Sequence, residues 1–128
     1  MSAEPVFGLS LWTTDIAGLS RFFELVAGMT VEQLHPGYAS LRANGARLIL
    51  HDDESYRGHP WYEALGREGV ARGIGAEIRV EVPDVEAAYG SALRLGALAI
   101  EAPCEVDGTR ECQVMGPDGY LLALWQWV

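Results

Sequence analysis

The sequence predicts an α+β fold made of two tandem β-α-β-β-β modules. Three observations lead to this prediction: an internal repeat, an aspartate that ends the first strand of each half, and a glycine-containing turn in each closing hairpin. The segments 7–16 and 76–85 are similar, because in both an alternating apolar run ends at an aspartate, Asp15 or Asp84. Recurrence of one unit along a chain is the signature of an internally repeated fold.

The first strand of each module is predicted from two-residue alternation. Its apolar members are Phe7, Leu9 and Leu11 in the first half and Ile78, Val80 and Val82 in the second. Alternate side chains of a strand point to opposite faces of the sheet, so each of these strands has one apolar face.

A helix is predicted after each aspartate. The apolar stripe is Ile16, Leu19, Phe22, Phe23 and Val26 in the first helix and Val85, Ala88, Tyr89, Ala92 and Leu93 in the second. This spacing lines one face of a helix, and aspartate is a preferred N-cap residue. Gly28 and Gly96 stand where helices commonly end on a glycine.

The rest of each half is predicted as a short strand followed by a hairpin. The short strands are 30–34 and 98–101, and the hairpins are 38–43 with 47–51 around Asn44-Gly45, and 111–115 with 120–127 around Gly116-Pro117-Asp118-Gly119. These dipeptides are strong turn signals. We therefore predict one domain over 1–128, with module one at 5–52, a connector at 53–73 containing a helical turn near Trp61 to Leu65, and module two at 74–128.

Composition is typical of a soluble globular domain and excludes several classes of protein. The chain has 128 residues, 49% of them hydrophobic, and a formal net charge of -9. A chain this acidic lacks the basic face that nucleic-acid binding requires. We see no signal peptide or membrane span and expect a cytoplasmic protein with no membrane partner. Cys104 and Cys112 are too few for a disulfide framework or a four-cysteine zinc site.

The paired modules and the closing Gly-Pro-Asp-Gly-Tyr turn at 116–120 resemble the vicinal oxygen chelate superfamily. This group includes glyoxalase I, extradiol dioxygenases, fosfomycin-resistance enzymes and bleomycin-resistance proteins. The resemblance covers about Phe7 to Trp127 and implies a glyoxalase/bleomycin-resistance-like fold, in which a curved mixed sheet forms a ligand cup. It also implies a homodimer, since binding clefts in the bleomycin-resistance group are commonly formed across one.

The resemblance places the usual metal ligands of the superfamily at Gly8, Ile49, Glu77 and Ala123. Among these four residues only Glu77 carries a coordinating atom. A transition metal needs three or more protein ligands. We therefore expect no metal and no other cofactor.

The residues that share the parity of these positions predict what lines the cup. They are Gly8, Ser10 and Trp12; Arg47, Ile49 and His51; Glu77, Arg79 and Glu81; and Leu121, Ala123, Trp125 and Trp127. Tryptophans, arginines and carboxylates together favour recognition of a flat, polar or charged organic molecule. The predicted ligand-binding residues are Trp12, Tyr38, Arg47, Ile49, His51, Glu77, Arg79 and Trp125. The alternative is that the charges neutralise one another at a dimer interface and the tryptophans are core.

The leading interpretation is a small-molecule binding protein of the bleomycin-resistance type, which sequesters an antibiotic or planar metabolite without a metal. The alternative is a glyoxalase- or dioxygenase-like lyase or isomerase that uses Glu77, with or without a metal, as a general base. A third possibility is a subunit that only scaffolds. His35 and His59 lie beside prolines in predicted turns, which favours solvated histidines in both places.

Overall fold

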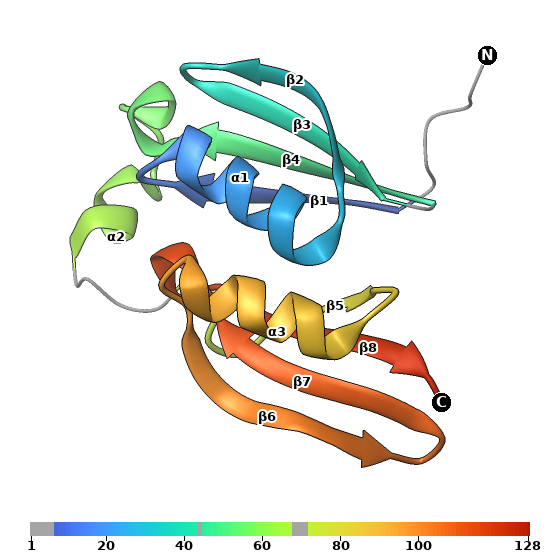
Figure 1. The fold of residues 1–128 in the computed structure, drawn as a ribbon. Coiled ribbons are helices and arrows are strands. Elements are labelled where there is room, and N and C mark those ends of the chain that lie inside the picture. The colour runs from blue at the N-terminus through green and yellow to red at the C-terminus, as the bar shows by residue number, and fades with distance from the viewer. Residues whose placement is uncertain (1–6, 44, 68–71) are drawn as a thin grey trace. The chain divides into compact units, whose positions relative to one another are not determined.

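The computed structural model describes residues 7–43, 45–67 and 72–128. The chain divides into two compact units, Met1–Glu24 with Met29–Gly69 and Leu25–Gly28 with Val70–Val128. Each unit holds a four-stranded mixed sheet, and the elements of each unit follow one another in the β-α-β-β-β order that the repeat predicts (Figure 1). The predicted α+β fold of two β-α-β-β-β modules is therefore confirmed.

The first unit contains one sheet with strand order β1-β4-β3-β2. Its elements are β1 (Phe7–Thr13), α1 (Ile16–Ala27), β2 (Thr30–His35), β3 (Tyr38–Ala43) and β4 (Ala46–Asp52). The first strand pairs in parallel with the last, and the other two pairings are antiparallel. A short 3-10 helix, η1 (Asp53–Tyr56), and α2 (Tyr62–Arg67) follow the sheet.

The second unit repeats this topology with strand order β5-β8-β7-β6. Its elements are β5 (Ile78–Glu81), α3 (Val85–Arg94), β6 (Leu98–Val106), β7 (Thr109–Met115), η2 (Pro117–Gly119) and β8 (Leu121–Trp127). Strands β5 and β8 are parallel, and helix α3 packs against β6, β7 and β8. None of the helices in the described ranges is long and apolar enough to cross a bilayer.

The predicted helix ends are confirmed by their hydrogen bonds. Asp15 Oδ1 accepts from the Gly18 N–H at 3.0 Å, and Asp84 Oδ1 accepts from the Ala87 N–H at 3.1 Å. Both bonds satisfy donors that have no partner inside the helix. At the end of α3, Gly96 has a φ of 94° and its N–H donates to the Leu93 carbonyl at 3.0 Å. This is the left-handed glycine cap that the sequence predicts.

Several strand bounds differ from the prediction by one residue, and two in the second unit differ by more. Strand β6 was expected at 98–101 but runs to Val106, and β7 begins at Thr109 rather than 111. Two register shifts accompany the extension, and Pro103 fits because β6 is the edge strand of its sheet. In the first hairpin, Gly45 has a φ of 71°, while Asn44 lies outside the described residues.

The core follows the predicted alternation. The helix-facing parity is buried at Leu11, Leu48, Leu50, Val80, Leu122 and Leu124, and Leu9 and Ile78 are half-buried. The apolar stripe of α1 is also buried, with Phe22 and Phe23 at 1% and 0% exposure. Strands β1, β3, β4, β5, β7 and β8 therefore contribute residues to the core, whereas the edge strands β2 and β6 have no buried residue.

Gly73, just before module two, lies in close contact with the backbone of Gly119 and Tyr120. The Gly73 N–H donates to the Gly119 carbonyl at 3.2 Å, and the Arg72 N–H donates to the Asp118 carbonyl at 2.9 Å. A Cβ atom on Gly73 would lie 2.7 Å from the Tyr120 Cα and 2.8 Å from the Gly119 oxygen. Because both neighbours are backbone atoms, they cannot rotate away.

We predict that Gly73→Ala destabilises the protein by about 1–3 kcal/mol, the usual cost of overpacking. Thermal unfolding followed by circular dichroism measures the effect. Gly66→Ala is the matched control, since a Cβ there meets nothing within 4 Å and the residue lies in α2. This control should be neutral or slightly stabilising, because alanine favours helix. Equal melting temperatures for Gly73→Ala and the parent would contradict the tight contact.

Candidate functional site

The strand register of the first sheet arranges its cup-side residues in three rows. We call these residues the first cup face: Gly8, Ser10 and Trp12 on β1; Tyr38, Ser40 and Arg42 on β3; and Arg47, Ile49 and His51 on β4. Register partners on neighbouring strands point to the same side of a sheet. The rows are aromatic at one end (Trp12, His51, Tyr38), small or aliphatic in the middle (Ser10, Ile49, Ser40), and basic at the other end (Gly8, Arg47, Arg42).

The aromatic end is part of a larger group of rings, the aromatic cluster. Its members are Trp12, His35, Tyr38, His51, Tyr56, His59 and Trp61. Trp12 is central: its ring centroid lies 5.2 Å from His51, 5.0 Å from Tyr56 and 6.0 Å from Trp61. These separations are those of interacting aromatic pairs. The cluster contains all three histidines of the chain.

The segment after β4 supplies a wall of this cluster. Tyr56 ends η1, and its ring centroid lies 4.5 Å from His59 and 5.7 Å from Trp61. The glycine-rich composition of this stretch predicts a connector, and these three residues are not among the predicted ligand-binding residues. An available signal was the run of Tyr, His and Trp at 56, 59 and 61, which is unusually aromatic for a linker.

The cluster is open to solvent on part of its surface. Trp12, Tyr38, His51 and Tyr56 are half-buried, whereas Trp61 is 43% exposed. Partial burial lowers the pKa of His51 below its ordinary value. His51 is therefore a neutral imidazole at neutral pH, so the cluster presents an uncharged aromatic surface at this position.

The basic end of the first cup face is held by hydrogen bonds and ion pairs. Arg42 Nε lies 3.1 Å from Glu32 Oε2, and Arg47 Nη2 lies 3.6 Å from Glu32 Oε1. Arg47 Nη1 also donates to Ser40 Oγ at 3.3 Å. Since Ser40 is in the middle row, the guanidinium of Arg47 extends from its own row toward the aromatic cluster.

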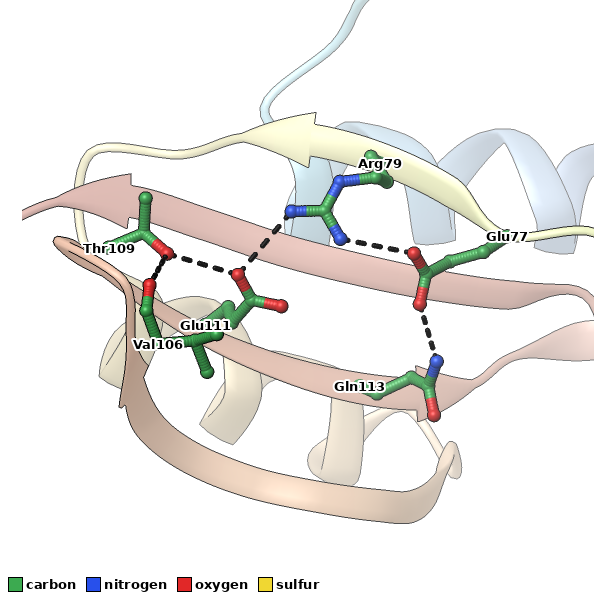
Figure 2. A network of polar contacts seen from close by, with 6 residues as sticks. All are labelled: Glu77, Arg79, Val106, Thr109, Glu111 and Gln113. Atoms are coloured by element: carbon green, nitrogen blue, oxygen red, sulfur yellow. Dashed lines mark hydrogen bonds and ion pairs between the residues drawn. The ribbon is translucent and has the colours of Figure 1, made fainter.

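The second sheet carries a separate polar network, shown in Figure 2. Arg79 Nη1 donates to Glu77 Oε1 at 3.1 Å, and Arg79 Nη2 donates to Glu111 Oε2 at 3.4 Å. Gln113 Nε2 donates to Glu77 Oε2 at 2.5 Å, and Thr109 Oγ1 donates to Glu111 at 3.0 Å. The hydrogen bonds to Glu77 and Glu111 raise the pKa of Arg79. Glu111 and Gln113 are not among the residues that the sequence predicts for the site.

This network bears on the predicted general base. Glu77 Oε1 accepts from Arg79 and Glu77 Oε2 accepts from Gln113, so both carboxylate oxygens already have a donor within the protein. A carboxylate acts as a base only when one oxygen reaches the substrate proton. These two bonds orient the carboxylate of Glu77, and each oxygen keeps a second lone pair that could accept a proton.

Trp125 lies on the same side of the second sheet as this network. Its register partners are Glu81 on β5 and Glu111 on β7, and its ring meets that of Trp127 edge-on at 5.3 Å. The predicted ligand-binding residues thus form two groups. Trp12, Tyr38, Arg47, Ile49 and His51 share the first cup face. Arg79 and Trp125 share a face of the second sheet, and Glu77, which precedes β5, is joined to that face by its hydrogen bonds with Arg79 and Gln113.

The residues at the superfamily's metal positions do not fit a metal ion. Gly8 and Ile49 on the first sheet and Ala123 on the second have no donor atom, and Ala123 is only 1% exposed. The remaining residue, Glu77, has both oxygens engaged by Arg79 and Gln113. Within 7–43, 45–67 and 72–128, no three His, Cys, Asp or Glu side chains are grouped to hold a metal. No metal-dependent step follows from these donors.

The two cysteines have the environment of structural residues. Cys112 is buried on β7, and burial raises the pKa of its thiol to about 11. Desolvation also raises the pKa of Cys104, with a smaller contribution from Glu101. A nucleophilic cysteine needs a lowered pKa, so neither thiol is prepared for catalysis.

We predict that His51 makes the stability of the protein fall in acid. Its folded pKa lies below the ordinary value of 6.5, so the unfolded chain takes up this proton more readily. The contribution is constant above about pH 7 and decreases as the pH falls through about 6.5 toward the folded pKa. Urea unfolding of the parent and His51→Gln between pH 8 and pH 5 measures it.

The expected result is a flatter dependence of the free energy of unfolding on pH in His51→Gln, whatever its stability at pH 8. The difference between the two proteins at pH 8 serves as the internal control, since it reports lost ring contacts alone. Parallel profiles for parent and variant across the whole range would show that His51 takes no part in the acid response.

Comparison with known proteins identifies the fold. No protein-family model matches the chain, and no curated protein matches its sequence. Solved structures do match: a glyoxalase/bleomycin resistance protein/dioxygenase family enzyme from Burkholderia phytofirmans PsJN has a TM-score of 0.74 at 20% identity, over 98% of this chain and 100% of that chain.

Two further structures support the same assignment. A glyoxalase-related enzyme from Fulvimarina pelagi has a TM-score of 0.73 at 16% identity, over 97% of this chain and 88% of that chain. TioX from Micromonospora sp. ML1 has a TM-score of 0.67 at 17% identity, over 99% of this chain and 100% of that chain. The chain therefore has the fold of the glyoxalase/bleomycin resistance protein/dioxygenase structures, which confirms the predicted resemblance to the vicinal oxygen chelate superfamily at the level of the fold.

Proposed function

We propose that the protein binds a planar organic molecule on the first cup face and sequesters it without changing it chemically, in the manner of a bleomycin-resistance protein. The observation that carries this proposal is the aromatic cluster around Trp12. Half-buried rings leave apolar surface in contact with water, and a flat ligand that covers them removes that cost. The ligand would be an antibiotic or another planar metabolite.

Sequestration is compatible with the state of the candidate base and of the metal positions. Both oxygens of Glu77 accept hydrogen bonds from within the protein. The metal positions offer a single carboxylate, at Glu77, and no other donor. A binding protein needs neither a base nor a metal, so both features are compatible with it.

The homodimer and the cytoplasmic location also belong to this proposal, and both rest on the resemblance and the composition. Sedimentation equilibrium at micromolar protein concentration tests the dimer directly. A single species of the monomer mass, 13.9 kDa, would remove it from the proposal without affecting ligand binding by the first cup face.

We predict that Trp12→Ala weakens binding of a planar ligand by about tenfold or more, equivalent to about 1.4 kcal/mol. The reason is that Trp12 contacts three other rings of the cluster, so its loss removes the centre of the stacking surface. A panel of planar aromatic antibiotics and metabolites is titrated by isothermal calorimetry. Binding to the parent should also quench part of the tryptophan fluorescence, because Trp12 and Trp61 are two of the four tryptophans of the chain.

Phe7→Ala is the matched control. Phe7 is also on β1, is 66% exposed and has the opposite parity from Trp12. It should bind ligand as the parent does. Normal binding by Trp12→Ala, together with a much lower melting temperature, would mean that Trp12 is a core residue and that the aromatic cluster is not the site.

A further inference from the structure

We infer that the ligand of the first cup face is an aromatic acid, in which a planar ring system is joined to a carboxylate or similar anionic group that Arg47 binds. This inference rests on the proposed function and names the chemical class of the molecule. It is carried by the position of the Arg47 guanidinium relative to the aromatic cluster.

Arg47 is held in one place by groups on two neighbouring strands. Its Nη1 donates to Ser40 Oγ on β3, and its Nη2 pairs with Glu32 on β2. A guanidinium fixed in this way loses little freedom when it binds an anion. Its side chain retains 22% exposure, so the group is positioned and still reachable from solvent.

The charges on this face favour an anion even though the chain is acidic. Of the described side chains on the first cup face and the Glu32 beside it, two are arginines and one is a carboxylate. His51, at the aromatic end, has a lowered pKa and adds no charge at neutral pH. The net charge of -9 therefore resides elsewhere on the chain, and it does not predict a cationic ligand for this face.

The spacing of the two ends sets the size of the molecule. Arg47 and His51 are four residues apart on β4, which is about 13 Å between their Cα atoms at about 3.3 Å per residue. The Ser40 contact places Arg47 Nη1 3.3 Å from a side chain of the middle row, and this row lies about half that distance from the aromatic row. A ring system with its acidic group on a short chain spans this gap.

Three fluorescent probes that differ only in their end group test the inference: 1-pyrenebutyric acid, 1-pyrenebutanol and 1-pyrenebutylamine. All three carry the same planar ring on the same chain. We expect the acid to bind about tenfold or more tightly than the alcohol, because a charged hydrogen bond to Arg47 is added. The amine should bind less tightly than the alcohol. Fluorescence titration in dilute buffer and in about 1 M salt measures all three.

Variants assign the effect to Arg47. In Arg47→Gln the acid should lose its advantage over the alcohol, so that the ratio of the two affinities falls to about one. Arg47→Lys should restore part of the advantage, since it keeps the charge but not the planar fork. Arg21→Gln is the matched control, because Arg21 is an exposed arginine on α1. Trp12→Ala should weaken all three probes equally.

The outcomes separate the two proposals. If the alcohol binds the parent as tightly as the acid, or if Arg47→Gln keeps the preference for the acid, the inference is wrong and the proposed planar-ligand site stands. If none of the probes binds, or if Trp12→Ala binds all three as the parent does, the proposed function fails and the inference fails with it. Thermal unfolding followed by circular dichroism shows whether Arg47→Gln folds, independently of its binding.

Discussion

The parallel pairing of the first and last strands of each module is the constraint on which the rest of the structure depends. In the first unit it sets Trp12 beside His51 and Gly8 beside Arg47. In the second it sets Glu81 beside Trp125. Antiparallel partners then extend each row across the sheet. A shift of one residue in either pairing would exchange the buried leucines with the site residues, so the core and the site are fixed by the same register.

The first cup face, where we propose that a ligand binds, follows from this register with few special residues. The middle row presents Ser10, Ile49 and Ser40, and the larger side chains stand at the two ends. The two ends of the face differ chemically, because large flat rings lie at one end and cations held by ion pairs lie at the other. A ligand with one aromatic end and one anionic end would have a preferred orientation there, because its aromatic end fits the rings and its anionic end fits the arginines.

The sequence was sufficient for the fold and for the residues that alternate along regular strands. Trp12, Arg47 and His51 were predicted on one face from parity, and the register confirms that they share it. Tyr56, His59 and Trp61 were missed, because the segment after β4 has neither strand nor helix periodicity from which to infer side-chain direction. His35 and His59 are exposed as predicted, yet their rings contact Tyr38 and Tyr56. Likewise, Gln113 on β7 reaches Glu77 across β8, because the sheet places β8 between β7 and β5. The order of the elements along the chain does not give this arrangement.

The segment between the two sheets is attached to regular structure at both of its ends. At its start the Asp52 N–H donates to the Gly37 carbonyl, and at its end the Gly73 N–H donates to the Gly119 carbonyl. The ring-bearing residues 56–61 lie between these two attachments, outside either sheet. Selection can therefore replace this stretch without disturbing a strand, much as an antibody exchanges a hypervariable loop on a constant framework. A lineage that retains both sheets can in this way acquire new ligands through one short, exchangeable part of the gene.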